Sequence, residues 1–203
     1  MAVNRLPQCH KHLIKMRTDT SATPTGSRWR TTWAYDGMGR AQVRTDHTWS
    51  GSAWAVSETT RYLYDGMRVI QERNASNTPT VSYTRGNDLS ASLEGAGGIG
   101  GLLARSHGYS SGTWSTHNHY HADGNGNVTF LVNSGQTAEA WYRYDPYGRT
   151  MAQSATALTT ANVYRFSSKE VHAQSGMYYY GFRFYDPHLQ RWPNRDPLGE
   201  EGA

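Results

Sequence analysis

Two closely spaced runs near the end of the chain decide its fold: Asn162-Val163-Tyr164-Arg165-Phe166-Ser167-Ser168-Lys169-Glu170, and Ser175-Gly176-Met177-Tyr178-Tyr179-Tyr180-Gly181-Phe182-Arg183-Phe184-Tyr185-Asp186-Pro187. Their aromatic residues favour β-strands, and an Asp-Pro turn ends the second run. A second Asp-Pro turn follows at Asp196-Pro197. This spacing of glycine, proline and bulky aromatic residues excludes a helix. The region therefore predicts short strands separated by tight turns.

One sequence unit recurs before this region. It has aromatic residues shortly before an aspartate, then a turn that contains glycine. The copies are Trp33-Ala34-Tyr35-Asp36-Gly37-Met38-Gly39-Arg40, Tyr62-Leu63-Tyr64-Asp65-Gly66-Met67-Arg68-Val69, Tyr120-His121-Ala122-Asp123-Gly124-Asn125-Gly126-Asn127-Val128 and Tyr142-Arg143-Tyr144-Asp145-Pro146-Tyr147-Gly148-Arg149, with Tyr185-Asp186-Pro187 as a degenerate fifth and Tyr83 to Asp88 as a weak candidate. Residues two apart in a strand share a face, so the paired aromatic residues lie together.

The aspartate of each unit leaves the strand, where its carboxylate can accept hydrogen bonds from turn N–H groups. Glycine three residues later permits a positive φ, so the chain doubles back as a hairpin. A hairpin with one aromatic face cannot bury that face alone. Stacked neighbours can bury it, which is the logic of repeat architectures.

The region 162–199 resembles the core-associated domain of Rhs and other YD-repeat proteins, and the recurring unit resembles their repeat. This family includes bacterial polymorphic toxins, the C subunits of insecticidal toxin complexes and, more distantly, animal teneurins. The resemblance implies an all-β fold in which a spiral of antiparallel β-hairpins is closed by the core-associated domain. The residues that carry the motif are Tyr35, Asp36, Tyr64, Asp65, Asp123, Tyr144, Asp145, Gly148, Tyr179, Gly181, Tyr185, Asp186 and Pro187.

The predicted organisation has four parts. Residues 1–28 carry no repeat signal, and we expect an irregular, poorly ordered segment there. Residues 29–161 are the repeat hairpins, 162–199 the core-associated domain and 200–203 a tail. About five repeats are too few for a sealed shell, so we expect a curved sheet with an exposed edge and an open concave face. The abrupt start of the repeats indicates a fragment of a longer repeat protein.

Composition narrows the functional classes. The chain has 203 residues, a formal net charge of +4 and 14 tyrosines. Its arginines are scattered among tyrosine and tryptophan, which favours surface pairing and cation–π stacking over a nucleic-acid interface. The single cysteine, Cys9, excludes an internal disulfide and a cysteine-based zinc site. No apolar stretch near the N-terminus suits a signal peptide or a membrane span. We expect secretion or surface display by a non-Sec route, or a cytoplasmic location for an isolated fragment.

The segment Pro193 to Gly199 resembles the autoproteolysis motif of toxin-bearing Rhs proteins. The resemblance implies Asp196 as a catalytic carboxylate, with Asp186 as the candidate partner for sharing a proton. Two departures weigh against it: Glu200 stands where those proteins usually have leucine, and four residues follow Gly199. In the alternative reading, which we favour, both aspartates cap turns before proline. No other enzyme motif occurs, so an enzyme is not indicated.

Two further patterns could each form a functional site or have only a structural role. His117, His119, His121 and Asp123 alternate, which is typical of a metal cluster on one strand face. The ordinary repeat already explains His121 and Asp123, so we expect no metal and no cofactor. The glycine-rich run Glu94 to Gly101 lacks the Lys-Ser/Thr ending of a phosphate-binding loop, which favours a flexible turn.

The sequence as a whole predicts a structural, encapsulating C-terminal portion of an Rhs toxin or cell-surface protein that lacks its toxin. The expected partners are the remainder of an Rhs shell or a C-terminal toxin domain. Two alternatives stay open: a self-cleaving core domain that depends on aspartate, and a β module whose aromatic surface binds carbohydrate.

Overall fold

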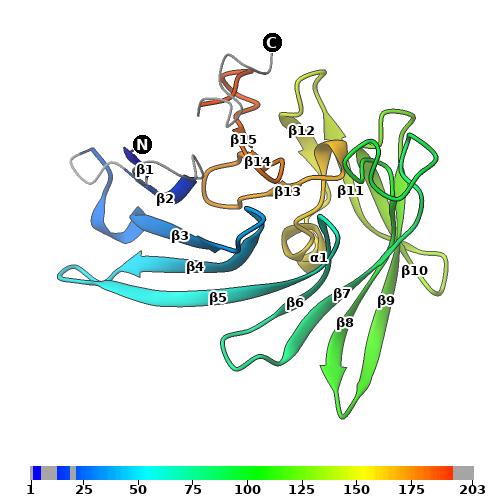
Figure 1. The fold of residues 1–203 in the computed structure, drawn as a ribbon, viewed down its shortest axis with the longest axis horizontal. Coiled ribbons are helices and arrows are strands. Elements are labelled where there is room, and N and C mark those ends of the chain that lie inside the picture. Colours follow the sequence, from blue (N-terminus) through cyan, green and yellow to red (C-terminus); the bar gives the residue numbers. More distant parts are fainter. Residues whose placement is uncertain (1, 6–12, 19–21, 194–203) are drawn as a thin grey trace.

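The structure, a computed structural model, describes residues 2–5, 13–18 and 22–193. Twelve strands form one antiparallel sheet in which each strand pairs with the next along the chain (Figure 1). In order, they are β1 Ala2–Arg5, β2 Leu13–Arg17, β3 Trp29–Tyr35, β4 Ala41–Trp49, β5 Trp54–Asp65, β6 Arg68–Arg73, β7 Pro79–Arg85, β8 Leu102–Ser110, β9 Thr113–Ala122, β10 Val128–Asn133, β11 Ala138–Tyr144 and β12 Thr150–Gln153. The predicted all-β fold of antiparallel hairpins is confirmed.

The remaining elements are short and follow the large sheet. They are the helix α1 Ala157–Ala161 and a second, three-stranded sheet of β13 Glu170–Val171, β14 Tyr178–Tyr179 and β15 Phe184–Tyr185. Single 3₁₀ turns occupy Thr25–Ser27 and Phe166–Ser168. In the part of the chain that the structure describes, no helix is long and apolar enough to cross a membrane.

The prediction of an irregular segment before residue 29 needs correction. Strands β1 and β2 lie in it, and β2 pairs with β3 in the register Lys15↔Thr32 and Arg17↔Arg30. Met16 is only 1% exposed and belongs to the same core cluster as Trp33. The segment lacks the aromatic unit, but Met16 is buried between the partly exposed Lys15 and Arg17, which is the alternation of a strand that continues the sheet.

The concave face is covered, although we had expected it to be open. The sheet curves, and α1, β13 and β14 lie on the inner side of that curve (Figure 1). Tyr164 of this region stacks edge-on against Tyr83 of β7, with ring centroids 4.9 Å apart, and Phe184 lies 5.2 Å from Trp33 of β3. We call residues 162–185 the inner segment. Its aromatic side chains cover the concave face of the sheet, because without a covering layer the aromatic faces of the hairpins would remain exposed to solvent.

The core divides into two clusters along the curve. Its larger part gathers the inward tyrosines of the middle and later strands around Leu131 and Val128, both fully buried. The smaller part lies around Trp33 and Phe184. Strand β7 shows the pattern that produces this arrangement, since Val81 and Tyr83 are buried while Thr80 and Thr84, on the other face of the same strand, are exposed. The alternation predicted from the repeat therefore places one aromatic face inside.

Candidate functional site

The recurring aspartates build one turn repeatedly. At Asp36, Asp123 and Asp145, the aspartate Oδ1 accepts hydrogen bonds from the backbone N–H groups two and four residues later, at 2.9–3.0 Å. The N–H of the glycine three residues later donates to the aspartate carbonyl, and these glycines have φ of 76° to 92°. The turn mechanism predicted from the sequence is confirmed at these three positions.

Asparagine makes the same turn at positions that the sequence reasoning missed. Asn133 Oδ1 accepts from the N–H groups of Gly135 and Thr137, and Asn74 Oδ1 accepts from Thr78. Gln136, three residues after Asn133, has φ of 64°. An asparagine at the position of the turn aspartate was the sequence signal for these turns. Its amide oxygen accepts the same backbone hydrogen bonds as a carboxylate, here from the residue four positions later.

The second copy of the unit departs from this geometry. Asp65 pairs directly with Arg68 across a two-residue hairpin loop, and Gly66 in that loop has φ of 59°. Its glycine follows the aspartate at once instead of three residues later, so the loop is shorter. Asp65 forms an ion pair with Arg68 instead of capping a turn.

Asparagine and alanine at Asp145 should therefore behave differently. We expect Asp145→Asn to change the free energy of unfolding by less than about 0.5 kcal/mol, because the amide oxygen keeps both turn hydrogen bonds. Asp145→Ala should cost about 1–2 kcal/mol, because two N–H groups lose their acceptor. Urea unfolding of both variants measures the difference. Equal losses in the two variants would show that the turn hydrogen bonds contribute nothing.

The weak copy at Tyr83 to Asp88 also ends in this turn. Asp88 Oδ1 accepts from Ser90 N–H, and its Oδ2 accepts from the N–H groups of Ala96 and Gly98 in the glycine-rich run. These hydrogen bonds, together with one from the Ser90 hydroxyl, outweigh desolvation and lower the pKa of Asp88 to about 2. The backbone of the glycine-rich loop thus binds the carboxylate of Asp88.

Asp186 caps a turn after β15. Its Oδ1 accepts from the N–H groups of His188 and Leu189, and its backbone forms a bridge with Arg191. Asp196 lies outside the described residues, so its pairing with Asp186 stays a prediction. Intact-mass measurement of a chain extended by its downstream coding sequence tests it, with Asp196→Asn as the control.

The other motif residues pack at the junction of the two sheets. Tyr64 and Tyr144 are partly buried against the larger core cluster, and Tyr35 and Tyr179 against the smaller one. The hydroxyls of Tyr64 and Tyr144 each donate at 2.8 Å to a carbonyl just beyond an earlier turn, that of Ala41 or Val128. Of the others, Gly148 and Gly181 have φ of 92° and 86°, Tyr185 stacks on Trp192, and Pro187 is buried.

A buried polar network joins the inner segment to the sheet. Glu170 Oε1 accepts from Arg44 Nη1 at 2.7 Å and from the Tyr62 hydroxyl at 2.8 Å. Arg44 Nε also donates to Asp46 Oδ2 at 3.0 Å. Arg44 and Asp46 are two residues apart on β4 and so share its inner face. The Arg44 guanidinium therefore pairs with two buried carboxylates, that of Asp46 in the large sheet and that of Glu170 in the small sheet.

His172 extends this network on the same face. Its Nε2 lies 2.9 Å from Thr31 Oγ1, and its Nδ1 lies 2.8 Å from Ser175 Oγ. Thr31 has one hydroxyl proton, and it donates that proton to Asp46 Oδ1. The Nε2 atom must then carry the imidazole proton and donate it to Thr31, while Nδ1 accepts from Ser175. The network is satisfied by a neutral His172.

The set formed by Ser175, His172 and Asp46 has a structural role. His172 is 3% exposed and Asp46 is 4% exposed, and the His172 ring packs against Trp29 and Trp33. Ser175 Oγ also accepts from Met177 N–H at 3.3 Å, which fixes the local turn. The set fixes the inner segment on the sheet. The sequence reasoning missed it, although Glu170 and His172 stand two apart in a strand-like run, which places both on one face.

The buried histidine predicts that stability decreases in mild acid. Burial lowers the pKa of His172 below its ordinary value, with Arg44 adding to the effect, although Asp46 and Glu170 favour the charged form. The unfolded chain therefore binds a proton below about pH 6.5 that the folded chain resists. We expect the free energy of unfolding to fall between pH 7.5 and 5.5, by at most about 1.4 kcal/mol per pH unit from this group.

His172→Gln should flatten this dependence, as urea unfolding at three pH values would show. Glu72 acts in the opposite direction, because desolvation and the nearby charge of Glu170 raise its pKa to about 6. The folded chain therefore binds the Glu72 proton more readily between about pH 4.5 and 6, so Glu72→Gln should steepen the loss. A His172→Gln variant with the slope of the unmodified protein would contradict the assignment.

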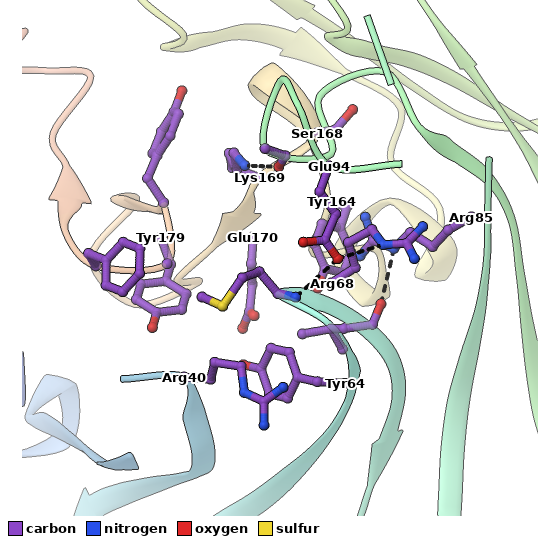
Figure 2. Close-up of a pocket in the computed structure, with 16 residues that line it drawn as sticks. Arg40, Tyr64, Arg68, Arg85, Glu94, Tyr164, Ser168, Lys169, Glu170 and Tyr179 are labelled. Carbon is purple, nitrogen blue, oxygen red and sulfur yellow. Dashed lines mark hydrogen bonds and ion pairs between the residues drawn. The ribbon is translucent and has the colours of Figure 1, made fainter. Parts of the chain in front are cut away.

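A cavity of about 230 Å³ opens beside the network (Figure 2). Its walls come from the hairpin of β5 and β6, from the glycine-rich loop and from the inner segment. The basic side chains that line it are Arg40, Arg68, Arg85 and Lys169, and the acidic ones are Glu94 and Glu170. In Figure 2, the labelled Arg85 lies next to Tyr164, and Tyr179 stands on the other side of Glu170.

The histidine pattern of β9 does not build a comparable site. His117, His119 and His121 are exposed on the outer face, and His117 Nδ1 lies 2.8 Å from Ser106 Oγ. Asp123 is engaged in its turn. Among the described residues, no three histidine, cysteine, aspartate or glutamate side chains lie close enough together to hold a metal ion.

Comparison with known proteins finds sequence relatives that include a deaminase toxin and a nuclease. The chain is 28% identical over 177 residues to "Double-stranded DNA deaminase toxin A" of Burkholderia cenocepacia (strain H111), which covers 85% of this chain and 12% of that protein. It is 29% identical over 140 residues to "tRNA3(Ser)-specific nuclease WapA" of Bacillus spizizenii, covering 68% of this chain and 5% of the relative. The chain thus spans a small part of the length of these relatives. No family model matches it.

The fold has a solved counterpart. The structure titled "Crystal Structure of TcdB2-TccC3" superposes with a TM-score of 0.66 over 97% of this chain and 9% of that one, at 21% sequence identity. This similarity shows the fold alone. The antiparallel sheet with its inner segment is thus an arrangement that also occurs within a much larger chain.

Proposed function

We propose that this chain is a wall segment of an Rhs (YD-repeat) protein, in the portion of such a protein that encloses a toxin domain. One observation carries the proposal. The large sheet runs in strict chain order from β1 to β12, and each of these two strands has a neighbour on one side only among the described residues. Such a sheet can be continued by further strands at both edges, as a wall requires.

Sequence similarity supports a toxin context. The relatives named above are a deaminase toxin and a tRNA nuclease, both several times longer than this chain, and the superposed structure contains the same fold as a small part of a long chain. The proposed partners are the neighbouring strands of the wall and an enclosed toxin domain. The proposed location is outside the producing cell.

The inner segment supports the same reading. It covers the concave face with contacts that join residues more than one hundred positions apart, such as Glu170 with Arg44 and Thr31 with His172. Charged groups this deeply buried lose free energy unless they are paired, so they fix the position of the segment on the sheet. A fixed inner layer stiffens a curved wall.

Expression together with the flanking coding sequence tests the proposal. We expect electron microscopy of the purified product to show a closed wall in which additional strands pair with β1 and β12. Flanking sequence that folds apart from both edges would contradict the proposal. A chain translated alone that stays monomeric in analytical ultracentrifugation, with both edges free, would contradict it too. Selective binding on a glycan array would favour the carbohydrate-binding alternative.

A further inference from the structure

The cavity beside the inner segment holds more positive charge than its acidic groups neutralise. Arg40 Nε forms an ion pair with Asp36 at 2.7 Å. Arg68 pairs with Asp65 and, at 3.2 Å, with Glu94. These two cations are therefore matched by carboxylates of their own.

The second acidic group of the cavity, Glu170, is engaged elsewhere. Its carboxylate accepts from Arg44 and from the Tyr62 hydroxyl in the buried network. Arg44 does not line the cavity. Glu170 is thus paired with a cation that does not line the cavity.

Arg85 and Lys169 form no ion pair with a carboxylate among the described residues. Arg85 Nε donates to the Val69 carbonyl at 3.0 Å, and Lys169 Nζ donates to the Gly97 carbonyl at 2.5 Å. In the described ranges, neither side chain has a carboxylate within 4.0 Å. Neutral carbonyls orient these two cations but do not compensate their charge.

The two charges repel each other in a half-buried site. Burial lowers the pKa of Lys169 to about 8, and the nearby positive charge of Arg85 adds to the shift, against a smaller opposing effect of the Asp88 carboxylate. Two cations held together away from bulk water cost free energy, and an anion placed between them would offset that cost.

The residues that line the cavity indicate which chemical groups a ligand needs besides its negative charge. The Arg85 guanidinium lies 4.9 Å from the ring centroid of Tyr164, and Lys169 Nζ lies 5.4 Å from that of Tyr180. The rings of Tyr64 and Tyr179 and the side chain of Val69 complete an aromatic and apolar lining. Flat apolar groups stack on such rings. The volume is below the roughly 300–1,000 Å³ that drug-sized ligands occupy, so a single ring suits it.

We propose that this cavity binds a small organic carboxylate with a flat apolar body, whose carboxylate lies between Arg85 and Lys169. The site is independent of the proposed wall role, because it lies within the chain and needs no partner. Arginine offers the planar donor pair that carboxylates accept, and lysine adds a compact charge.

Calorimetry with three probes tests the proposal on the intact chain. Benzoate should bind, whereas benzamide, which has the same ring and no charge, should bind at least tenfold more weakly. Inorganic phosphate should also bind at least tenfold more weakly, because it cannot use the aromatic walls. Lys169→Gln should weaken benzoate binding at least tenfold, and the matched variant Arg143→Gln, which removes an exposed charge on β11, should leave it unchanged. Equal affinity for benzoate and either other probe would overturn the assignment.

A labelling experiment gives a second answer that does not depend on a variant folding. The chain has three lysines, Lys11, Lys15 and Lys169. Formaldehyde condenses with a lysine amine to an imine and water, and borohydride reduces the imine to a stable methylamine that peptide mass mapping detects. We expect Lys169 to be labelled faster than Lys15, and excess benzoate to suppress its labelling at least fivefold. Labelling of Lys169 that benzoate leaves unchanged would overturn the proposal.

Discussion

Replacing Arg44 with methionine is expected to lower the free energy of unfolding by about 3–5 kcal/mol, because it leaves two buried carboxylates without their cation. Glu170 and Asp46 both accept from this guanidinium, and their side chains are 10% and 5% exposed. Methionine keeps most of the volume and removes the charge, so packing alone cannot account for a loss of this size. Urea unfolding followed by tryptophan fluorescence measures it.

The matched control is Arg143→Met on β11, which makes the same chemical change at an exposed position. It should shift the unfolding free energy by less than about 0.5 kcal/mol. Adding Glu170→Gln to Arg44→Met should recover part of the loss, since one unpaired charge disappears. If Arg44→Met is no more harmful than Arg143→Met, the network does not hold the inner segment.

The repeat could be read from the sequence because each of its parts has a local cause. An aspartate with a glycine three residues later specifies the turns at Asp36, Asp123 and Asp145 without reference to the rest of the chain. Alternating aromatic residues specify which face is buried. Strand β2 escaped prediction because its buried residue Met16 carries no such local signal.

The inner network could not be predicted from the sequence for the opposite reason. Glu170 meets Arg44 across 126 residues, and His172 meets Thr31 across 141. Nothing local distinguishes these residues from ordinary solvated side chains, because their role depends on how the sheet curves. The candidate catalytic aspartates show the same limit: the turn at Asp186 is local and readable, whereas its pairing with a distant group is not.

The strongest test of the inner layer as a whole is Tyr178→Ala, which should cost about 3–5 kcal/mol. Tyr178 is 1% exposed, its ring lies 5.9 Å from Phe166, and its hydroxyl donates to the Gly148 carbonyl at 3.1 Å. Removal of the ring leaves a cavity between the inner segment and the turn after β11. Tyr178→Phe removes only the hydrogen bond and should cost about 1 kcal/mol.

Limited proteolysis distinguishes loss of docking from general instability. Cleavage of Tyr178→Ala within residues 162–185 should become faster than cleavage within the large sheet, because local opening needs less free energy once the anchor is gone. Tyr147→Ala is the control, since Tyr147 is 49% exposed on the same turn. Equal cleavage rates in Tyr178→Ala and Tyr147→Ala would mean that the inner segment is held by the charged network alone. The aromatic rings would then add nothing to its attachment.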